Sequence, residues 1–204
     1  PMFTSCCPAW VSFVKSQYPQ LAGNLSTAKS PQQMFGAVAK TYFAQKLGVS
    51  PEKICCISIM PCVSKKMEAV LPDMYSAGAG ADVDIVLTTR EFARLVRAEH
   101  IAPALLTEEA FDSPLGESTG AGVIFGVTGG VMEAALRTAV ETLTGEELEK
   151  VDFTDVRGTE GIKEAVYNVA GMDVKVAVAS GLGNAKELLN RVKSGEADYH
   201  FIEI

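Results

Sequence analysis

The stretch from Lys53 to Ala69 reads KICCISIMPCVSKKMEA and decides how the chain is expected to fold. Residues 53–60 are rich in Ile and apolar on both faces, which predicts a buried strand. Pro61 ends this strand because it has no N–H to donate to a sheet. Cys55 and Cys56 fall inside the strand, so we expect them to serve as small hydrophobic residues of the core.

Strands and helices alternate on either side of this stretch. Ser30 followed by Pro31 predicts the N-cap and first position of a helix that continues to about Leu47. Thr88 is expected to cap another helix that has Glu91 in its first turn. The remaining patterns predict strands at 83–87, 174–178 and 200–204 and helices at 89–98, 130–143 and 185–193. This alternation predicts an α/β fold with mainly parallel sheets flanked by helices, and a weak boundary near 100–120 suggests two lobes.

The composition narrows the class of protein. The 204 residues are 48% hydrophobic and 21% charged, with a net charge of −7, which argues against a protein that binds nucleic acid through charge. No apolar run approaches the roughly 20 residues that span a bilayer, so membrane insertion is not expected. The five cysteines are odd in number and not spaced like a secreted disulfide scaffold, which favours a cytoplasmic protein with metal-binding or reactive thiols.

Two adjacent thiols near the start of the chain are the first candidates for chemistry. Cys6 and Cys7 lie between Ser5 and Pro8 in the segment TSCCPAW. Neighbouring side chains of an extended loop point in different directions, so one thiol could be a metal ligand and the other a free thiol with an ordinary pKa near ~8.5. Two buried structural cysteines are the alternative.

A third cysteine follows the predicted strand directly. Cys62 lies at the carboxyl end of that strand, where open α/β sheets place their ligands. Lys65 and Lys66 come next and would favour a thiolate or hold an anionic ligand. A small apolar residue before a helix with solvated lysines is the other interpretation.

The Gly-rich segments do not form a nucleotide-binding motif. The segment 120–126 has no preceding strand, and in Ser180–Lys186 a lysine replaces the third glycine of the dinucleotide motif. The run of glycines in 125–135 is instead expected to allow a close backbone approach. His100 and His200 have no spacing typical of a zinc site.

Five segments together resemble the catalytic domain of [FeFe]-hydrogenases, and they occur in that family's order. They are TSCCPAW (4–10), LSTAKSPQQ (25–33), MPCVSKKMEA (60–69), GVTGGVMEAA (126–135) and YHFIEI (199–204). The resemblance covers essentially the whole chain. It implies a two-lobed iron-only hydrogenase fold and the reversible reduction of protons to H2. The implied cofactor is the H-cluster, a [4Fe–4S] cluster bridged to a two-iron centre with CO and cyanide ligands.

The same resemblance implies partners and residue roles. Electrons would come from ferredoxin or another redox protein or subunit, and maturation proteins would install the cofactor. Cys7 and Cys62 are implied as ligands of the [4Fe–4S] cluster, and Cys6 as the thiol that exchanges protons with the two-iron centre. Ser26 would be a later step of that proton path, and the Lys65 ammonium would donate to a cyanide. The implied pocket lining is Pro31, Gln32, Met60 and Phe125.

The chain also departs from the family pattern. The family's third signature, which supplies the other two cysteine ligands, follows a segment like 199–204 and is not in this sequence. We therefore expect residues 1–204 to be an internal fragment of the H-cluster-binding domain, inactive alone. A non-enzymatic relative, such as an iron–sulfur assembly factor or an H2 sensor, is the alternative. Cys6 and Lys65 favour the enzyme, because a protein that holds only a [4Fe–4S] cluster needs neither.

Overall fold

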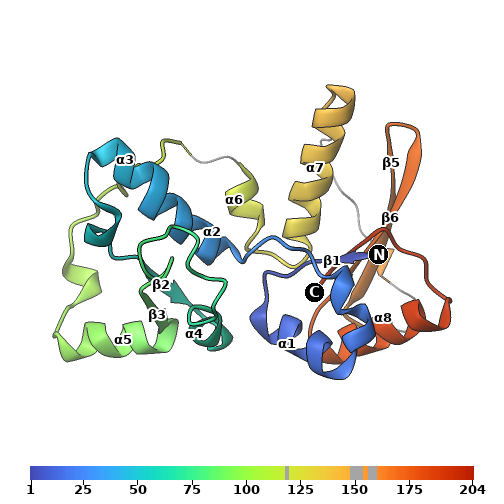
Figure 1. Ribbon diagram of the computed structural model, residues 1–204, viewed down its shortest axis with the longest axis horizontal. Helices are drawn as coiled ribbons and strands as arrows, with labels where there is room; N and C mark the ends of the chain where they lie inside the picture. The colour runs from blue at the N-terminus through green and yellow to red at the C-terminus, as the bar shows by residue number, and fades with distance from the viewer. Residues whose placement is uncertain (118–119, 148–153, 156–159) are drawn as a thin grey trace. The chain divides into compact units, whose positions relative to one another are not determined.

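The computed structural model describes residues 1–117, 120–147, 154–155 and 160–204, which form two compact units. The first unit consists of Pro1–Ser5, Trp10–Thr27 and Ser118–Ile204, and the second of Cys6–Ala9 and Ala28–Glu117. Each unit contains its own sheet (Figure 1). Helix α1 (Pro8–Gln17) begins in the second unit and continues in the first.

A long helical run opens the main part of the second unit, as the sequence predicts. It consists of α2 (Pro31–Val38), a π-helical turn η2 (Ala39–Phe43) and α3 (Ala44–Leu47). Gly48 ends it with a φ of +67°, a left-handed conformation that glycine adopts without strain. Ser30 occupies the N-cap position, but its hydroxyl makes no capping bond.

The sheet of the second unit has two parallel strands, β2 (Ile57–Met60) and β3 (Ile85–Thr88). The prediction of a strand buried on both faces is wrong, because Ile57 and Ile59 are 56% and 46% exposed. Only one side of β2 is covered in the part of the chain that the structure describes. Cys55 and Cys56 precede the strand, and Cys55 is exposed, so their assignment as core residues is also wrong.

Short helices complete the second unit. The predicted cap of α5 (Thr89–Ala98) is confirmed, since Thr88 and Glu91 form a reciprocal capping box. The other elements are α4 (Ser64–Glu68), η3 (Pro51–Lys53) and η4 (Pro103–Leu105). Gly36 of α2 approaches the backbone of Asp82, and a Cβ atom there would lie 2.3 Å from the Asp82 carbonyl oxygen.

The first unit contains a mixed sheet with the strand order β1-β7-β6-β5-β4. Strands β1 (Met2–Phe3), β7 (Phe201–Glu203) and β6 (Met172–Ala179) run parallel, as expected for the α/β class. Strand β5 (Ile162–Val169) pairs antiparallel with β6, and β4 (Thr154–Asp155) pairs antiparallel with β5. These two strands were not predicted. A two-residue turn joins β5 to β6, and both of its residues have positive φ: Ala170 (+51°) and Gly171 (+85°).

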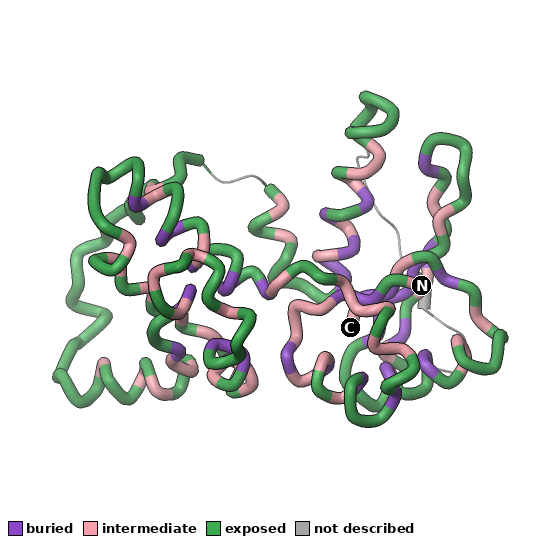
Figure 2. The backbone as a smooth tube through the Cα atoms, in the orientation of Figure 1, coloured by how far each residue is buried: buried purple, intermediate pink, exposed green. Residues whose placement is uncertain are grey.

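Two predicted helices pack in this unit, α7 (Gly130–Thr144) and α8 (Leu182–Ser194), and η1 (Pro19–Asn24) follows α1. The early turns of α7 are buried and its last turn is exposed (Figure 2). Met132 and Leu136 of α7 form a core with Val176 and Val178 of β6.

The predicted close backbone approach is confirmed at the start of α7. A Cβ atom on Gly130 would lie 1.7 Å from the carbonyl oxygen of Ile124, the last residue of α6 (Gly120–Ile124), so only glycine fits. The buried Glu203 carboxylate of β7 accepts the backbone N–H groups of Gly129 and Met132 at 3.0 and 2.6 Å. These bonds satisfy orphan donors of the helix start. Among the described residues, no helix has the length and apolar character that a membrane span requires.

Candidate functional site

The first and second cysteine segments meet in the second unit through one hydrogen bond. Strand β2 ends at Met60, Pro61 breaks it, and α4 begins two residues after Cys62. Lys65 lies in the first turn of α4, and its Nζ atom donates to the carbonyl oxygen of Cys6 at 2.9 Å. The structure thus joins two segments that are 59 positions apart in the sequence.

Lys65 is a buried cation. Lys65 is 6% exposed, and its ammonium takes part in none of the ion pairs among the described residues. An ammonium has three N–H donors, and the Cys6 carbonyl uses one of them. Burying a charge without a partner is costly, so this position is suited to an anionic ligand with acceptor atoms.

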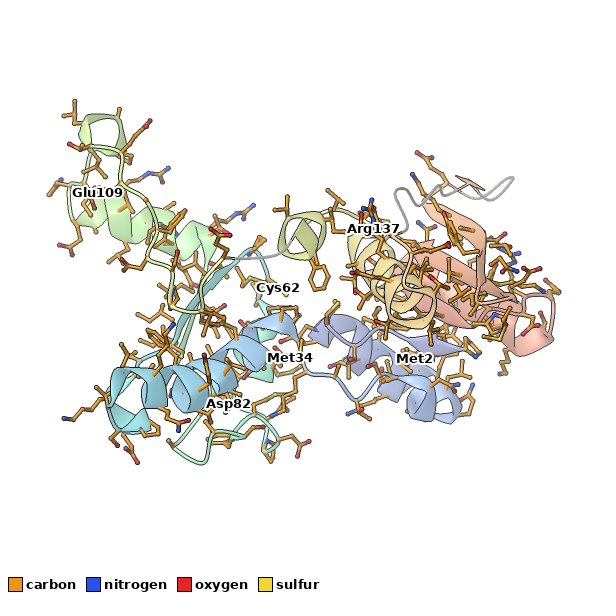
Figure 3. The ribbon with its side chains drawn as sticks, turned by 90° about the horizontal axis from the view of Figure 1, so that it is seen from above. Met2, Met34, Cys62, Asp82, Glu109 and Arg137 are labelled. Atoms are coloured by element: carbon orange, nitrogen blue, oxygen red, sulfur yellow. The ribbon has the colours of Figure 1, made fainter. Side chains whose placement is uncertain are left out.

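The three predicted site cysteines lie in the same unit. Cys6 and Cys7 immediately precede α1, and Cys62 lies between β2 and α4 (labelled in Figure 3). All three are half-buried. The described residues hold no group of three or more Cys, His, Asp or Glu side chains that could bind a metal ion. A [4Fe–4S] cluster uses four protein ligands, so the donor set of this chain fits part of that requirement.

A buried polar network connects α2 to α4 beside Lys65. The Glu68 carboxylate accepts from the Ser30 hydroxyl at 2.7 Å and from the Gln32 amide at 2.9 Å. The Gln32 carbonyl in turn accepts from the Ser58 hydroxyl of β2 at 2.6 Å. Ser30, Gln32 and Glu68 are 0%, 8% and 4% exposed. Both polar ends of Gln32 are therefore fixed within the protein.

Glu68 and Ser58, the partners of the Gln32 side chain, were not predicted from the sequence, nor was Ser30, the second donor to Glu68. Glu68 lies three residues after Lys65, which places both on one face of a helix, and this spacing was the available signal. The contact between Glu68 and Ser30 spans 38 positions, and no local pattern reports it.

Two of the four predicted pocket residues line one cavity. Gln32 and Met60 border a cavity of about 240 Å³ in the second unit, and Pro31 does not line it. The rest of its lining comes from α2 and from the residues around β2 and β3: Phe35, Gly36, Cys56, Ile57, Ser58, Ile59 and Val83.

The predicted proton-path residue Ser26 and the predicted pocket residue Phe125 belong to the first unit. Ser26 is half-buried, and its backbone N–H donates to the Phe3 carbonyl at 2.8 Å. Phe125 is 41% exposed and follows α6. The structure therefore brings together Cys6, Lys65, Gln32 and Met60 in one unit and describes Ser26 and Phe125 in the other.

Comparison with known proteins identifies the class to which this fold and these cysteine segments belong. The family described as "Iron only hydrogenase large subunit, C-terminal domain" matches residues 1–204. The chain belongs to this family.

Particular relatives are similar over the whole chain. It is 55% identical to the NADP-reducing hydrogenase subunit HndD of Solidesulfovibrio fructosivorans and 50% identical to the periplasmic [Fe] hydrogenase large subunit of Nitratidesulfovibrio vulgaris. It covers 34% and 48% of these two proteins, so it spans a third to a half of their length. A variant of the apo [FeFe]-hydrogenase HydA1 from Chlamydomonas reinhardtii superposes with a TM-score of 0.85 at 40% identity, over 100% of this chain and 58% of that one. The bovine cytosolic iron-sulfur assembly component 3 is more distant, at 31% identity over 44% of its length.

Proposed function

We propose that the protein carrying this chain is an [FeFe]-hydrogenase that catalyses the reversible reduction of protons to H2. The observation that carries the proposal is the bond from the Lys65 ammonium to the Cys6 carbonyl. It joins the two cysteine segments through a buried cation that has N–H donors left for an anionic ligand. The identity of 55% to a hydrogenase subunit supports the same conclusion.

The H-cluster is the cofactor that these residues fit in part. Cys7 and Cys62 would each supply a thiolate to the [4Fe–4S] cluster, and Lys65 would donate a charge-assisted hydrogen bond to a cyanide. When bound, the cluster supplies the redox-active iron at which protons and electrons combine. Since the 204 residues contain two of the four expected cysteine ligands, we expect residues 1–204 to evolve no H2 by themselves.

The chain's own residues would deliver protons and shape the pocket. The half-buried Cys6 thiol can hold a proton at Sγ, and the Lys65 bond to its carbonyl limits the conformations of this segment. Ser26 would be a later step of the same proton path, as the family resemblance implies. Met60 and Gln32 would form part of the pocket wall, and an apolar wall would slow the loss of small ligands. The family resemblance also implies Pro31 and Phe125 as lining residues.

Partners and location follow from the same proposal. We expect ferredoxin or a related redox protein to exchange electrons with the complete enzyme, and maturation proteins to install the two-iron centre. We place the protein in the cytoplasm because its five cysteines are odd in number and not spaced like a secreted disulfide scaffold. One relative is named a periplasmic enzyme, so fractionation of the source cells is the test of location.

A chimera tests the proposed activity directly. Residues 1–204 would replace the matching segment of the 55% identical HndD subunit, which supplies the rest of the protein. After maturation, the chimera is expected to evolve H2 from a reduced viologen dye. Cys62→Ala should abolish this activity, and Cys55→Ala should retain it, because Cys55 is exposed and outside the site. A folded, iron-loaded chimera without H2 evolution would favour the iron–sulfur assembly alternative.

A further inference from the structure

Lys65 and Glu68 lie on one face of α4 but do not pair. Both residues are buried, at 6% and 4% exposure, and they are three positions apart. Opposite charges at this spacing on a helix normally meet, and buried charges normally find a counter-charge. The ion pairs of the described residues nevertheless include none between these two side chains.

Neutral donors occupy the carboxylate instead. The Oε2 atom of Glu68 accepts from the Ser30 hydroxyl at 2.7 Å and from the Gln32 amide at 2.9 Å. The ammonium of Lys65 is bonded to the Cys6 carbonyl at 2.9 Å. Both bonds from uncharged groups go to Oε2, so this oxygen has its donors without the ammonium.

We propose that Ser30 and Gln32 are positioning residues that hold the Glu68 carboxylate away from Lys65, so that the buried ammonium stays available to a small linear anion. The inference rests on the proposed function, in which that anion is a cyanide ligand of the cofactor. Without the two neutral donors, rotation of the Glu68 side chain would bring its charge to Lys65 and neutralise it. The resulting internal ion pair would compete with the ligand for the same N–H donors.

Titration of the iron-free chain with sodium thiocyanate tests this proposal. Lysine ammonium signals are followed by proton–nitrogen NMR, with sodium chloride added to keep the ionic strength constant. Lys65→Met identifies the Lys65 signal by its loss. In the wild-type chain this signal is expected to shift with thiocyanate, and Ser30→Ala should weaken the apparent affinity about tenfold, the equivalent of one lost charge-assisted hydrogen bond.

A second substitution separates positioning from simple structural support. Glu68→Gln added to Ser30→Ala should restore the thiocyanate affinity, because a neutral side chain cannot neutralise Lys65. Ser16→Ala is the matched control and should leave the thiocyanate affinity unchanged, since the Ser16 hydroxyl donates to the Phe13 carbonyl, outside the Glu68 network. Ser30 makes no capping bond, so Ser30→Ala removes no helix cap. If Ser30→Ala fails to fold, the same titration and rescue are carried out with Gln32→Leu, with and without Glu68→Gln.

Three results would overturn the proposal. They are a wild-type Lys65 signal that does not respond to thiocyanate, an affinity unchanged by Ser30→Ala, and a loss that Glu68→Gln does not restore. Because the titration uses the iron-free chain, it is independent of H2 evolution by the chimera. A positive titration with an inactive chimera would refute the proposed function and leave the anion site in place.

Discussion

The Nζ atom of Lys65 lies 2.9 Å from the carbonyl oxygen of Cys6, and this bond links the first and second cysteine segments. It fixes the start of α4 against the loop that carries Cys6 and Cys7. The position of Lys65 follows from the abrupt end of β2 before Pro61. Helix α4 begins three residues after this proline, at Ser64. The short strand and its proline thus place a cation next to the segment with the adjacent thiols.

Replacing this cation should affect activity more than stability. Lys65→Met keeps the volume of the side chain and removes both a buried charge and one hydrogen bond, two effects of opposite sign. We expect the free energy of unfolding to change by less than about 2 kcal/mol and H2 evolution by the chimera to fall at least about tenfold.

Lys66→Met is the matched control for that substitution. Lys66 is partly exposed and pairs with Glu91 at 2.9 Å, outside the site. Lys66→Met should leave H2 evolution by the chimera unchanged. Equal losses of activity in the two variants would contradict a specific role for Lys65. Urea denaturation measures the stability of both.

A methyl group at Gly36 should destabilise the second unit. Its Cβ atom would lie 2.3 Å from the Asp82 carbonyl oxygen and 2.9 Å from a Val83 methyl group, so the backbone has to move. We expect Gly36→Ala to cost about 1–3 kcal/mol in urea denaturation. Gly183→Ala, at a helical glycine with open space around it, should be neutral or stabilising. Equal stability of the two variants would show that α2 and the Asp82 backbone are not in close contact.

Acid should remove the contribution of Glu91. The hydrogen bond from Lys66 and the capping bond from the Thr88 backbone lower the pKa of Glu91 from 4.5 to about 2. A carboxyl group with a depressed folded-state pKa stabilises the protein above the unfolded value and loses that effect as pH falls. The stability difference between wild type and Glu91→Gln should therefore shrink between pH 4.5 and pH 2. Glu109→Gln, at an exposed glutamate (Figure 3), should show no such trend.

The local patterns of the sequence predicted the elements that depend on local chemistry. Ser30 and Pro31 marked the start of a helix, Thr88 and Glu91 formed the expected capping box, and the glycines before α7 allowed the expected close approach. Each of these features is decided by residues within a few positions of one another. The fold class followed from the order of the helices and strands along the chain, and the family followed from the resemblance of five sequence segments.

Features that depend on distant contacts were missed or misjudged. The Ile-rich stretch predicted a strand buried on both faces, but burial of β2 depends on what covers it, and Ile57 is 56% exposed. In the β5–β6 turn, Ala170 has a positive φ, and alanine is not a residue that predicts this conformation. The Glu68 network joins α2 to α4 across 38 positions. Its carboxylate was recognisable only as a neighbour of Lys65.

Iron binding by the chimera tests the central claim most directly. The chimera is loaded anaerobically with ferrous iron and sulfide, and its iron content and low-temperature EPR spectrum are measured. Cys7→Ala and Cys62→Ala should each remove the signal of the [4Fe–4S] cluster, and Cys55→Ala should retain it. Full iron content in both the Cys7 and Cys62 variants, or its loss in the Cys55 variant, would contradict the assignment of these two cysteine segments as the cluster site.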